Sequence, residues 1–385
     1  MADVDWREGK ITDAGIAEMR DQIGVKGPVP GWNTTVSEDG IWHFALGIGD
    51  DNPLWWDADY AAKSSWGGRI APPSYLYSHT SGPRLTPEAG KMIVEMFLPG
   101  VLGLWAGERW RWTRPARVGE RITTESALVD VQVNESGRFG GRSVAHTEHL
   151  ELKTDSGELV AEVFRTIKRF ERGEAVSRSS YLDRPIAFYT AADRERIDRH
   201  YASEAASLRR GSEPRYVEDV RIGDALGPML KGPLTVSNII GFLLGWGTGL
   251  AATNRIHSHH LELHPETKMV HPETGIAENF EAPHWEPAFA KASGLPGAYD
   301  FGCQRFSWFT HLLTDWAGDD GFLSELDFRL KRPNIVGDVT WLSGEVIEVN
   351  PSTRTVRISV TAVNQLNETT ATGVGTIILP SRSDA

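Results

Sequence analysis

The sequence predicts an α+β fold built from two versions of one unit. Residues 56–61 align with residues 285–290 without a gap, at an offset of 229. At an offset of 218, Arg114-Pro115 aligns with Arg332-Pro333, and the following Val-Gly-Glu with Val-Gly-Asp. Two repeats in the same order indicate a duplicated domain. In each half, segments of helical periodicity precede a run of alternating segments, and this order is typical of an α+β unit.

The first unit begins with helices. Residues 12–22 read as a short amphipathic helix with a Thr or Asp cap, and residues 35–48 as a second helix with an apolar face. That helix runs directly into Gly49-Asp50-Asp51-Asn52-Pro53, where Asp, Asn and Pro favour a turn. A third helical piece is expected from Pro72-Pro73.

Strands follow from about residue 104. Alternating apolar residues predict further strands over residues 122–133, 143–153 and 159–170, with turns at residues 135–137 and 155–157. Residues 190–193 resemble a capping box in front of a charged helix in the connector. We therefore expect a first unit over residues 1–172, a helical linker over 173–215 and a second unit over 216–385.

The second unit repeats this plan. Thr235 to Ser237 correspond to Thr35 to Ser37 at an offset of 200, and predict the start of a helix that ends at Trp246. A central helix is expected over residues 303–316, followed by strands over residues 326–330, 339–349, 355–363 and 369–379. Because the offset grows from 200 to 229 after this first helix, we expect an insertion in the second unit, roughly over residues 248–277.

Five histidines lie in this insertion, at positions 257, 259, 260, 264 and 271. Such clustering invites a metal site, and His260 and His264 have one-turn helical spacing. However, Glu262 is not placed as in the His-Glu-x-x-His motif and Pro265 follows His264 at once. We expect no metal, and a surface or lid loop instead.

The composition excludes several classes. A formal net charge of -12 argues against a nucleic-acid surface, which requires clustered Lys and Arg. The single Cys303 excludes an intrachain disulfide and fits a reducing cytoplasm. The N-terminus has no signal-peptide pattern, and no apolar run reaches the roughly 20 residues that span a bilayer. A cytoplasmic protein without a membrane partner is expected.

The repeated segments carry a family resemblance. Gly49-Asp50-x-Asn52-Pro53-Leu54, then an Ala-containing helix, then Ile-Ala-Pro-Pro, resembles the MaoC-like type-2 enoyl-CoA hydratases and dehydratases, as does Arg-Pro-x-x-Val-Gly-Asp/Glu at the start of a strand. The resemblance covers most of residues 30–170 and 220–380. It implies a tandem (double) hotdog fold, each unit an antiparallel sheet wrapped around a central helix, with an N-terminal unit of the FAS1-like dehydratase type.

The resemblance also implies a catalytic arrangement. In the hydratases that this chain resembles, an Asp and a His five residues apart activate water, and the backbone N–H of a Gly that starts the central helix holds the thioester oxygen. The second unit keeps His284 and Gly302 and has Asn279 at the Asp position. We expect His284 to be the acid/base, Asn279 with Glu281 to position water, and Gly302 to bind the thioester oxygen.

The first unit lacks two of these three parts. It keeps Asp50, but Trp55 stands at the His position and Pro73 at the Gly position, and proline has no N–H. This unit is expected to be non-catalytic and to line an acyl pocket with Asp50, Asn52, Trp55 and Trp56. An alternative for Asp50 and Asn52 is a side-chain network that stabilises the turn.

The expected function is hydration of a 2-enoyl-CoA, or dehydration of a 3-hydroxyacyl-CoA, within fatty acid metabolism and with a bulky or long acyl group. The substrate is a CoA or acyl-carrier-protein thioester, and no cofactor is expected. Two alternatives stay open: a non-catalytic acyl-thioester-binding protein or partner subunit, and a hotdog thioesterase. The sequence also leaves open a homo-oligomer.

Overall fold

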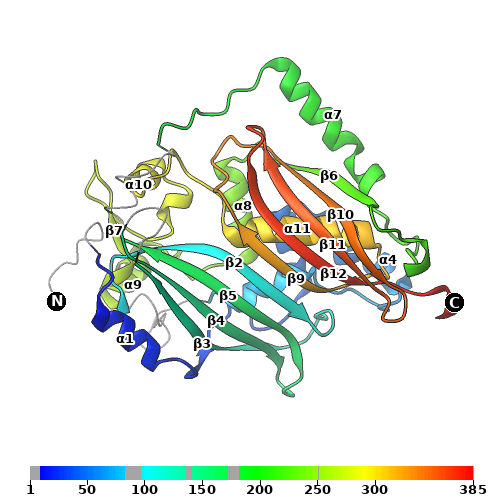
Figure 1. Ribbon diagram of the computed structural model, residues 1–385, viewed down its shortest axis with the longest axis horizontal. Helices are drawn as coiled ribbons and strands as arrows, with labels where there is room; N and C mark the ends of the chain where they lie inside the picture. Colours follow the sequence, from blue (N-terminus) through cyan, green and yellow to red (C-terminus); the bar gives the residue numbers. More distant parts are fainter. Residues whose placement is uncertain are drawn as a thin grey trace.

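A computed structural model describes residues 9–82, 97–135, 141–171, 173, 182–249 and 251–384. Within these residues, one large antiparallel sheet has the strand order β1-β3-β4-β5-β2-β9-β12-β11-β10-β6. The two halves of this order mirror each other: β1 corresponds to β6, β3 to β10, β4 to β11, β5 to β12 and β2 to β9. Five strands come from each unit, and the units join where β2 pairs with β9 (Figure 1).

The strands of the first unit are β1 (Lys26–Val29), β2 (Leu102–Trp112), β3 (Ile122–Asn134), β4 (Ser143–Thr154) and β5 (Leu159–Phe170). Those of the second unit are β6 (Ala225–Lys231), β9 (Phe322–Leu330), β10 (Thr340–Asn350), β11 (Thr355–Asn364) and β12 (Thr369–Ile378). The long predicted strands are therefore confirmed to within a few residues. The short edge strands β1 and β6 were not predicted. The turn predicted at residues 135–137 falls largely outside the described residues.

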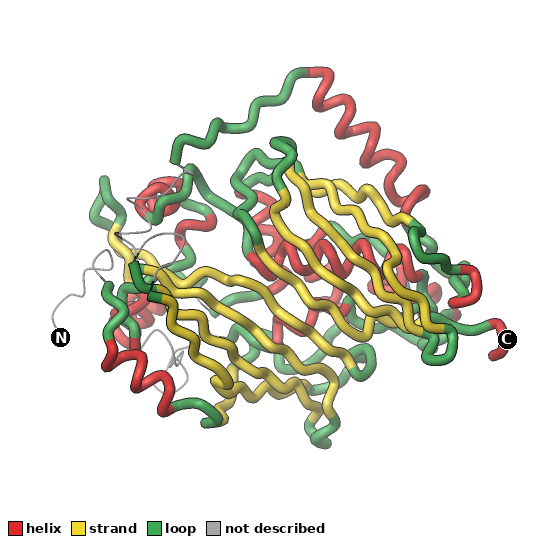
Figure 2. Tube along the Cα trace, viewed as in Figure 1, coloured by secondary structure: helices red, strands yellow, loops and turns green. Residues whose placement is uncertain are grey.

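The α-helices lie mainly on the concave side of the sheet (Figure 2). They are α1 (Asp13–Asp21), α2 (Glu38–Ile48), α3 (Pro53–Trp56), α4 (Ala58–Lys63), α7 (Ala191–Leu208), α8 (Val236–Trp246), α9 (Asn254–Leu263), α10 (Pro287–Ala292) and α11 (Gly302–Ala317). Short 3-10 helices are η1 (Pro73–His79), η2 (Val217–Asp219), η3 (Pro265–Thr267), η4 (Ala282–His284) and η5 (Arg382–Asp384).

Helix α11 is the central helix of the second unit. Fourteen residues of this 16-residue helix are buried, which fits a helix enclosed on all sides. Its counterpart in the first unit is η1, a 3-10 helix of seven residues that begins at Pro73. The two units therefore contribute unequally to the interior.

Helices α2 and α8 pack against each other near two glycines. A Cβ atom on Gly245 would lie 2.4 Å from the carbonyl oxygen of His43, and one on Gly47 would lie 2.7 Å from that of Gly241. Only glycine permits so close a backbone approach. The pair brings the ends of the two repeated helices together above α11.

The helix caps correct one predicted offset. Ser37 caps α2 and Thr235 caps α8, so equivalent caps are related by an offset of 198 rather than 200. The predicted match of Thr35 with Thr235 was therefore displaced by two residues. Both helices have 11 residues, and the capping box of α8 is completed by Asn238. The insertion in the second unit is accordingly two residues longer than the sequence repeats predicted.

The insertion is more ordered than a loop. It forms helix α9, η3 and a two-stranded hairpin of β7 (Lys268–Val270) and β8 (Ala277–Asn279). Helix α7 of the linker follows the predicted capping box: the N–H of Asp193 donates to Thr190 Oγ1 at 3.2 Å, and the N–H of Thr190 donates to Asp193 Oδ2 at 3.0 Å. None of the helices in the described part of the chain combines the length and apolar character that a bilayer crossing requires.

Candidate active site

The segment before the central helix has the same turn in both units. In the first unit, Asp50 Oδ1 accepts a hydrogen bond from the N–H of Asn52 at 3.1 Å. In the second, Asn279 Oδ1 accepts one from the N–H of Glu281 at 2.9 Å. These pairs are related by the offset of 229. A carboxylate and an amide oxygen serve equally well as the acceptor in such a turn, so the change from Asp to Asn leaves the turn intact.

His284 lies at the end of η4, against the start of α11. Its Nδ1 donates to the carbonyl oxygen of Tyr299 at 2.9 Å, and its ring stacks on Phe301 with a centroid distance of 3.8 Å. With the hydrogen on Nδ1, Nε2 is the acceptor. Burial lowers the pKa of His284 to about 4, although hydrogen bonds to the backbone of Tyr299 and Asp300 oppose the shift. The imidazole is therefore neutral at pH 7.

The N-terminus of α11 is held by a buried ion pair. Arg305 Nε donates to Asp300 Oδ2 at 2.8 Å, and a second guanidinium nitrogen of Arg305 contacts Asp300 Oδ1. Asp300 also accepts from the N–H of Asn334 at 3.2 Å. Both members of the pair are almost fully buried. This network fixes residues 299–301, and hence the partners of His284.

Gly302 is the first residue of α11. The first N–H groups of a helix have no acceptor within the helix and lie at its positive end. The N-cap residue, Phe301, has no side-chain group that could accept from them. A Cβ atom on Gly302 would lie 2.9 Å from Leu330 Cδ1 and 3.2 Å from Trp105 Cβ. A larger residue here would force Leu330 and Trp105 to shift, so glycine suits this packing. The first N–H groups of α11 have no acceptor within the helix.

Asn279 and Glu281 lie on the segment that leads into η4. Asn279 ends β8 and is 1% exposed, whereas Glu281 is 8% exposed and its Oε2 lies 3.5 Å from Thr248 Oγ1. These two residues and His284 lie within six positions of the chain, and the N–H of His284 donates to the carbonyl oxygen of Glu281 at 2.9 Å. His284 stacks on Phe301, and Phe301 directly precedes Gly302 at the start of α11.

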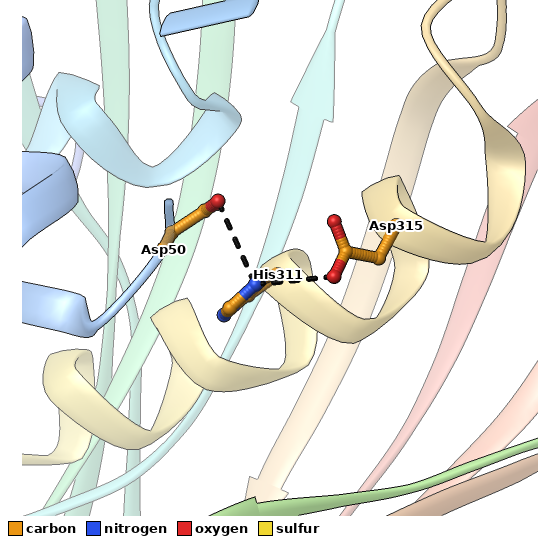
Figure 3. A group of neighbouring side chains, drawn as sticks. All are labelled: Asp50, His311 and Asp315. Carbon is orange, nitrogen blue, oxygen red and sulfur yellow. Dashed lines mark ion pairs between the residues drawn. The ribbon is translucent and has the colours of Figure 1, made fainter. Parts of the chain in front are cut away.

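The four residues predicted to line an acyl pocket are divided in the structure. Asn52 and Trp55 border a cavity of about 30 Å³, which is too small for an acyl chain. Trp56 is 43% exposed and packs against Trp42 with a ring-centroid distance of 5.8 Å. Asp50 points instead toward α11 (Figure 3).

Asp50 belongs to a group that we call the ionic cluster: Asp50, Lys231, His311 and Asp315. His311 Nε2 lies 3.5 Å from Asp50 Oδ1 and 3.3 Å from Asp315 Oδ2, as Figure 3 shows. Lys231 Nζ lies 2.7 Å from His311 Nδ1 and also donates to the carbonyl oxygens of Ile48 and Gly49, both at 3.2 Å. All four side chains are more than nine-tenths buried.

These contacts indicate which nitrogen of His311 carries the hydrogen and how the pKa values of the two carboxyl groups are shifted. A lysine ammonium has only donors, so His311 Nδ1 accepts and its Nε2 carries the hydrogen toward the carboxylates. Burial raises the pKa of Asp50, although His311 and Lys231 oppose the shift. Burial would also raise the pKa of Asp315, but His311, Arg209 and Lys231 lower it below its usual value. The two carboxyl groups are thus pushed in opposite directions.

His311, Asp315 and Lys231 were missed in the sequence. His311 lies in the other unit from Asp50, far along the chain, and no spacing rule links the two. One signal was present: His311 and Asp315 are one turn apart within a helix that is otherwise rich in apolar residues. Titratable groups on an enclosed helix require partners, and this requirement could have drawn attention to them.

The five histidines of the insertion do not form one group, although His260 and His264 contact each other. His257 Nε2 lies 3.8 Å from Glu278, and His271 Nδ1 accepts from the N–H groups of Glu273 and Thr274, both at 3.2 Å. The rings of His260 and His264 are 5.0 Å apart. Among the described residues, the group of His, Asp, Glu or Cys side chains close enough to share an ion is Asp50, His311 and Asp315, whose donor atoms lie within 4.8 Å of one another.

Sequence comparisons with known proteins match part of the chain, and the family match lies in the first unit. Residues 21–163 match the family described as "FAS1-like, dehydratase domain region". A UPF0336 protein from Parafrankia sp. (strain EAN1pec) is 31% identical over 147 residues, which are 37% of this chain and 87% of that protein.

Solved structures resemble the whole chain. A MaoC-like dehydratase covers 94% of this chain with all of its own, at 19% identity and a TM-score of 0.65. Rv0216 from Mycobacterium tuberculosis, described as having a double hotdog fold, covers 95% of this chain with 99% of its own, at 14% identity and a TM-score of 0.56. At these identities the likeness concerns the fold, and the predicted tandem hotdog fold is confirmed.

Proposed function

Because this chain belongs to the UPF0336 family and has the double hotdog fold of the MaoC-like dehydratases, we propose that it reversibly hydrates a 2-enoyl thioester. The predicted resemblance to that dehydratase family is confirmed by these comparisons. The reaction and its site residues are our proposal. The substrate is an acyl-CoA or acyl-carrier-protein thioester with a bulky or long acyl group.

One observation carries the proposal: a neutral imidazole is fixed beside the N-terminus of the central helix, where no side chain of the N-cap residue accepts from the helix N–H groups. His284 is held by Tyr299 and Phe301, and Gly302 begins α11 directly after Phe301. A base next to a site for a developing oxyanion is what addition of water to an enoyl thioester requires.

The residues have distinct roles in this reaction. His284 Nε2 takes a proton from water as the water oxygen bonds to Cβ. The N–H groups at the start of α11 stabilise the negative charge that develops on the thioester oxygen. Asn279 and Glu281 orient the water. The proton held by His284 then passes to Cα, which completes the addition without any change in oxidation state of the protein.

Kinetics of a His284→Gln variant test the proposal. We expect hydration of 2-enoyl-CoA substrates to lose about 10²–10⁴-fold in kcat, the usual contribution of a general base. His259→Gln is the matched control, since His259 lies in the insertion with an exposed side chain, and it should retain wild-type rates. Because the pKa of His284 is about 4, the wild type should keep its activity at pH 5.5, where an ordinary histidine is mostly protonated.

The outcomes separate the competing functions. Binding of acyl-CoA without turnover would favour an acyl-thioester-binding protein. Release of free CoA would favour a thioesterase. Equal rates for His284→Gln and His259→Gln would remove His284 from the site.

A further inference from the structure

A pocket of about 430 Å³ opens on the ionic cluster, away from His284. Its walls come from the end of α2, from α7 and the residue after it, from the end of β6, from the first half of α8, and from one side of α11. Along α11 it extends from Gln304 in the first turn to Asp315 in the last, roughly 16 Å at 1.5 Å per residue. This volume lies in the usual range for small-molecule sites.

Three members of the ionic cluster line this pocket: Lys231, His311 and Asp315. His311 Nε2 is buried between Asp50 and Asp315, and its 3.3 Å contact with Asp315 Oδ2 is a long and poorly aligned one. A buried N–H without an aligned acceptor is costly unless a ligand or water completes it. The cluster is thus arranged to receive an oxygen atom.

The ionic cluster provides an imidazole beside Asp50, which the first unit itself lacks. Asp50 occupies the position of the Asp in the repeated turn, but Trp55 stands where the second unit has His284. Trp55 is 3% exposed and cannot serve as a base. The imidazole beside Asp50 comes instead from His311, on the central helix of the other unit.

We propose that Asp315, His311 and Asp50 form a second acid–base site, composed from both units, that hydrates or dehydrates an acyl thioester bound in the 430 Å³ pocket. This inference rests on the proposed function, and it assigns a second set of residues to that chemistry. Asp315 is the base, His311 holds the water oxygen through Nε2–H, and Asp50 is a positioning residue for the imidazole.

The proposed addition neither gains nor loses a proton. Asp315 takes one proton from water as the oxygen forms its bond to Cβ of the conjugated double bond. The electron pair of that double bond moves toward the thioester, and Cα receives the proton back from Asp315. Dehydration is the reverse.

The charges around the ionic cluster favour an acid–base site over a cation-binding site. Lys231 is in contact with His311, and Arg209 Nε lies 3.4 Å from Asp315 Oδ1. The two buried carboxylates therefore already have cations beside them, although Arg209 also pairs with Asp51. A divalent ion would add uncompensated charge in a buried site.

Variants are made in the His284→Gln background, so that only the second site can turn over substrate. His311→Gln and Asp315→Asn should each reduce the residual hydration of a series of 2-enoyl-CoA substrates at least about 100-fold. Asp50→Asn should lower kcat by about tenfold with KM unchanged, and should shift the acid limb of the rate profile. The groups that face Asp50 and contribute to that limb are His311, Asp315 and Lys231. His146→Gln, another fully buried histidine, is the control and should leave the residual rate unchanged.

A variant that fills the pocket separates loss of the second site from loss of the fold. Gly241 borders the pocket, and a Cβ atom placed there would meet no atom within 4 Å. Gly241→Phe should therefore fold, keep the His284 reaction in an otherwise wild-type chain, and remove the residual rate in the His284→Gln background.

Each contrary result has a separate meaning. If the His284→Gln chain has no residual rate above the uncatalysed reaction, or if His311→Gln behaves like His146→Gln, the second site is wrong and the proposed function stands. If the wild type hydrates no thioester, both are wrong. Stoichiometric Zn²⁺ binding that His311→Gln abolishes would overturn the acid–base assignment.

Discussion

At the scale of single residues, Arg305 and Asp300 decide whether the start of α11 is correctly placed. Arg305 is 1% exposed and also donates to the carbonyl oxygens of Arg332 and Thr370, at 2.6 and 2.9 Å. Its guanidinium therefore ties the helix to two neighbouring segments. Removing one member of such a pair leaves a buried charge without its counterion.

We expect Arg305→Met to lower the free energy of unfolding by about 3–5 kcal/mol. Chemical denaturation at pH 7 measures it. Adding Asp300→Asn should recover part of the loss, since the unpaired charge is then removed. The exposed pair Arg357–Glu348 is the control, and Arg357→Met should cost less than about 1 kcal/mol. A small effect of Arg305→Met would show that the network does not hold the helix end.

The residue scale is also where sequence reasoning reached its limit. The repeat at offset 229 located His284, Asn279 and Gly302, because local turns and helix starts leave a pattern in the chain. The ionic cluster leaves none. Asp50 and His311 come from different units, and only the packing of α2 over α11 brings them together.

At the scale of elements, the two repeated helices differ in how they are capped. Thr235 and Asn238 form a reciprocal capping box on α8: the N–H of Asn238 donates to Thr235 Oγ1 at 3.1 Å and the N–H of Thr235 donates to Asn238 Oδ1 at 2.8 Å. On α2, Ser37 Oγ accepts a single bond from the N–H of Gly40 at 3.0 Å.

Thr235→Ala should therefore destabilise the protein more than Ser37→Ala, each within about 0.5–2 kcal/mol. Thermal unfolding of the two single variants provides the comparison. Thr35→Ala, two residues before the cap of α2, should have little effect if Ser37 is the true counterpart of Thr235. A larger loss for Thr35→Ala than for Ser37→Ala would restore the offset of 200.

The elements themselves could be predicted where they are long and periodic. Strand β5 was predicted with both ends correct, and α11 within one residue at each end. The edge strand β6 was missed because Gly227 and Pro228 interrupt its alternation, and β1 because it has four residues with Gly and Pro at its centre. Such strands depend on a neighbour for their hydrogen bonds rather than on their own composition.

At the scale of the whole molecule, one sheet runs through both units. Strands β2 and β9 pair from Gly107 opposite Arg329 to Arg111 opposite Glu325, and α2 packs on α8 across the same boundary. The linker runs along one edge of the sheet, where α7, at the upper right of Figure 1, packs on β6 of the second unit: the N–H of Leu230 donates to Glu204 Oε2 at 2.7 Å. Continuity of the sheet, rather than the linker, therefore holds the halves together.

A protease site inserted in the exposed stretch near Ile186 tests this. After cleavage, the two fragments should elute together at the position of the intact chain, because a shared sheet and a helix pair remain buried. Size-exclusion chromatography followed by denaturing electrophoresis detects both fragments in one peak. Separate elution at physiological salt would mean that the covalent link is needed.

The palindromic strand order has a consequence for how such a molecule can change over time. In an assembly of two identical chains, every substitution appears twice, on both sides of the axis, and must be tolerated in both places. Joining the halves in one chain removes this constraint. Here an imidazole could be placed against Asp50 without a second one being forced against Asn279. In a fused chain, the residues around Asp50 and those around Asn279 can therefore change independently of each other.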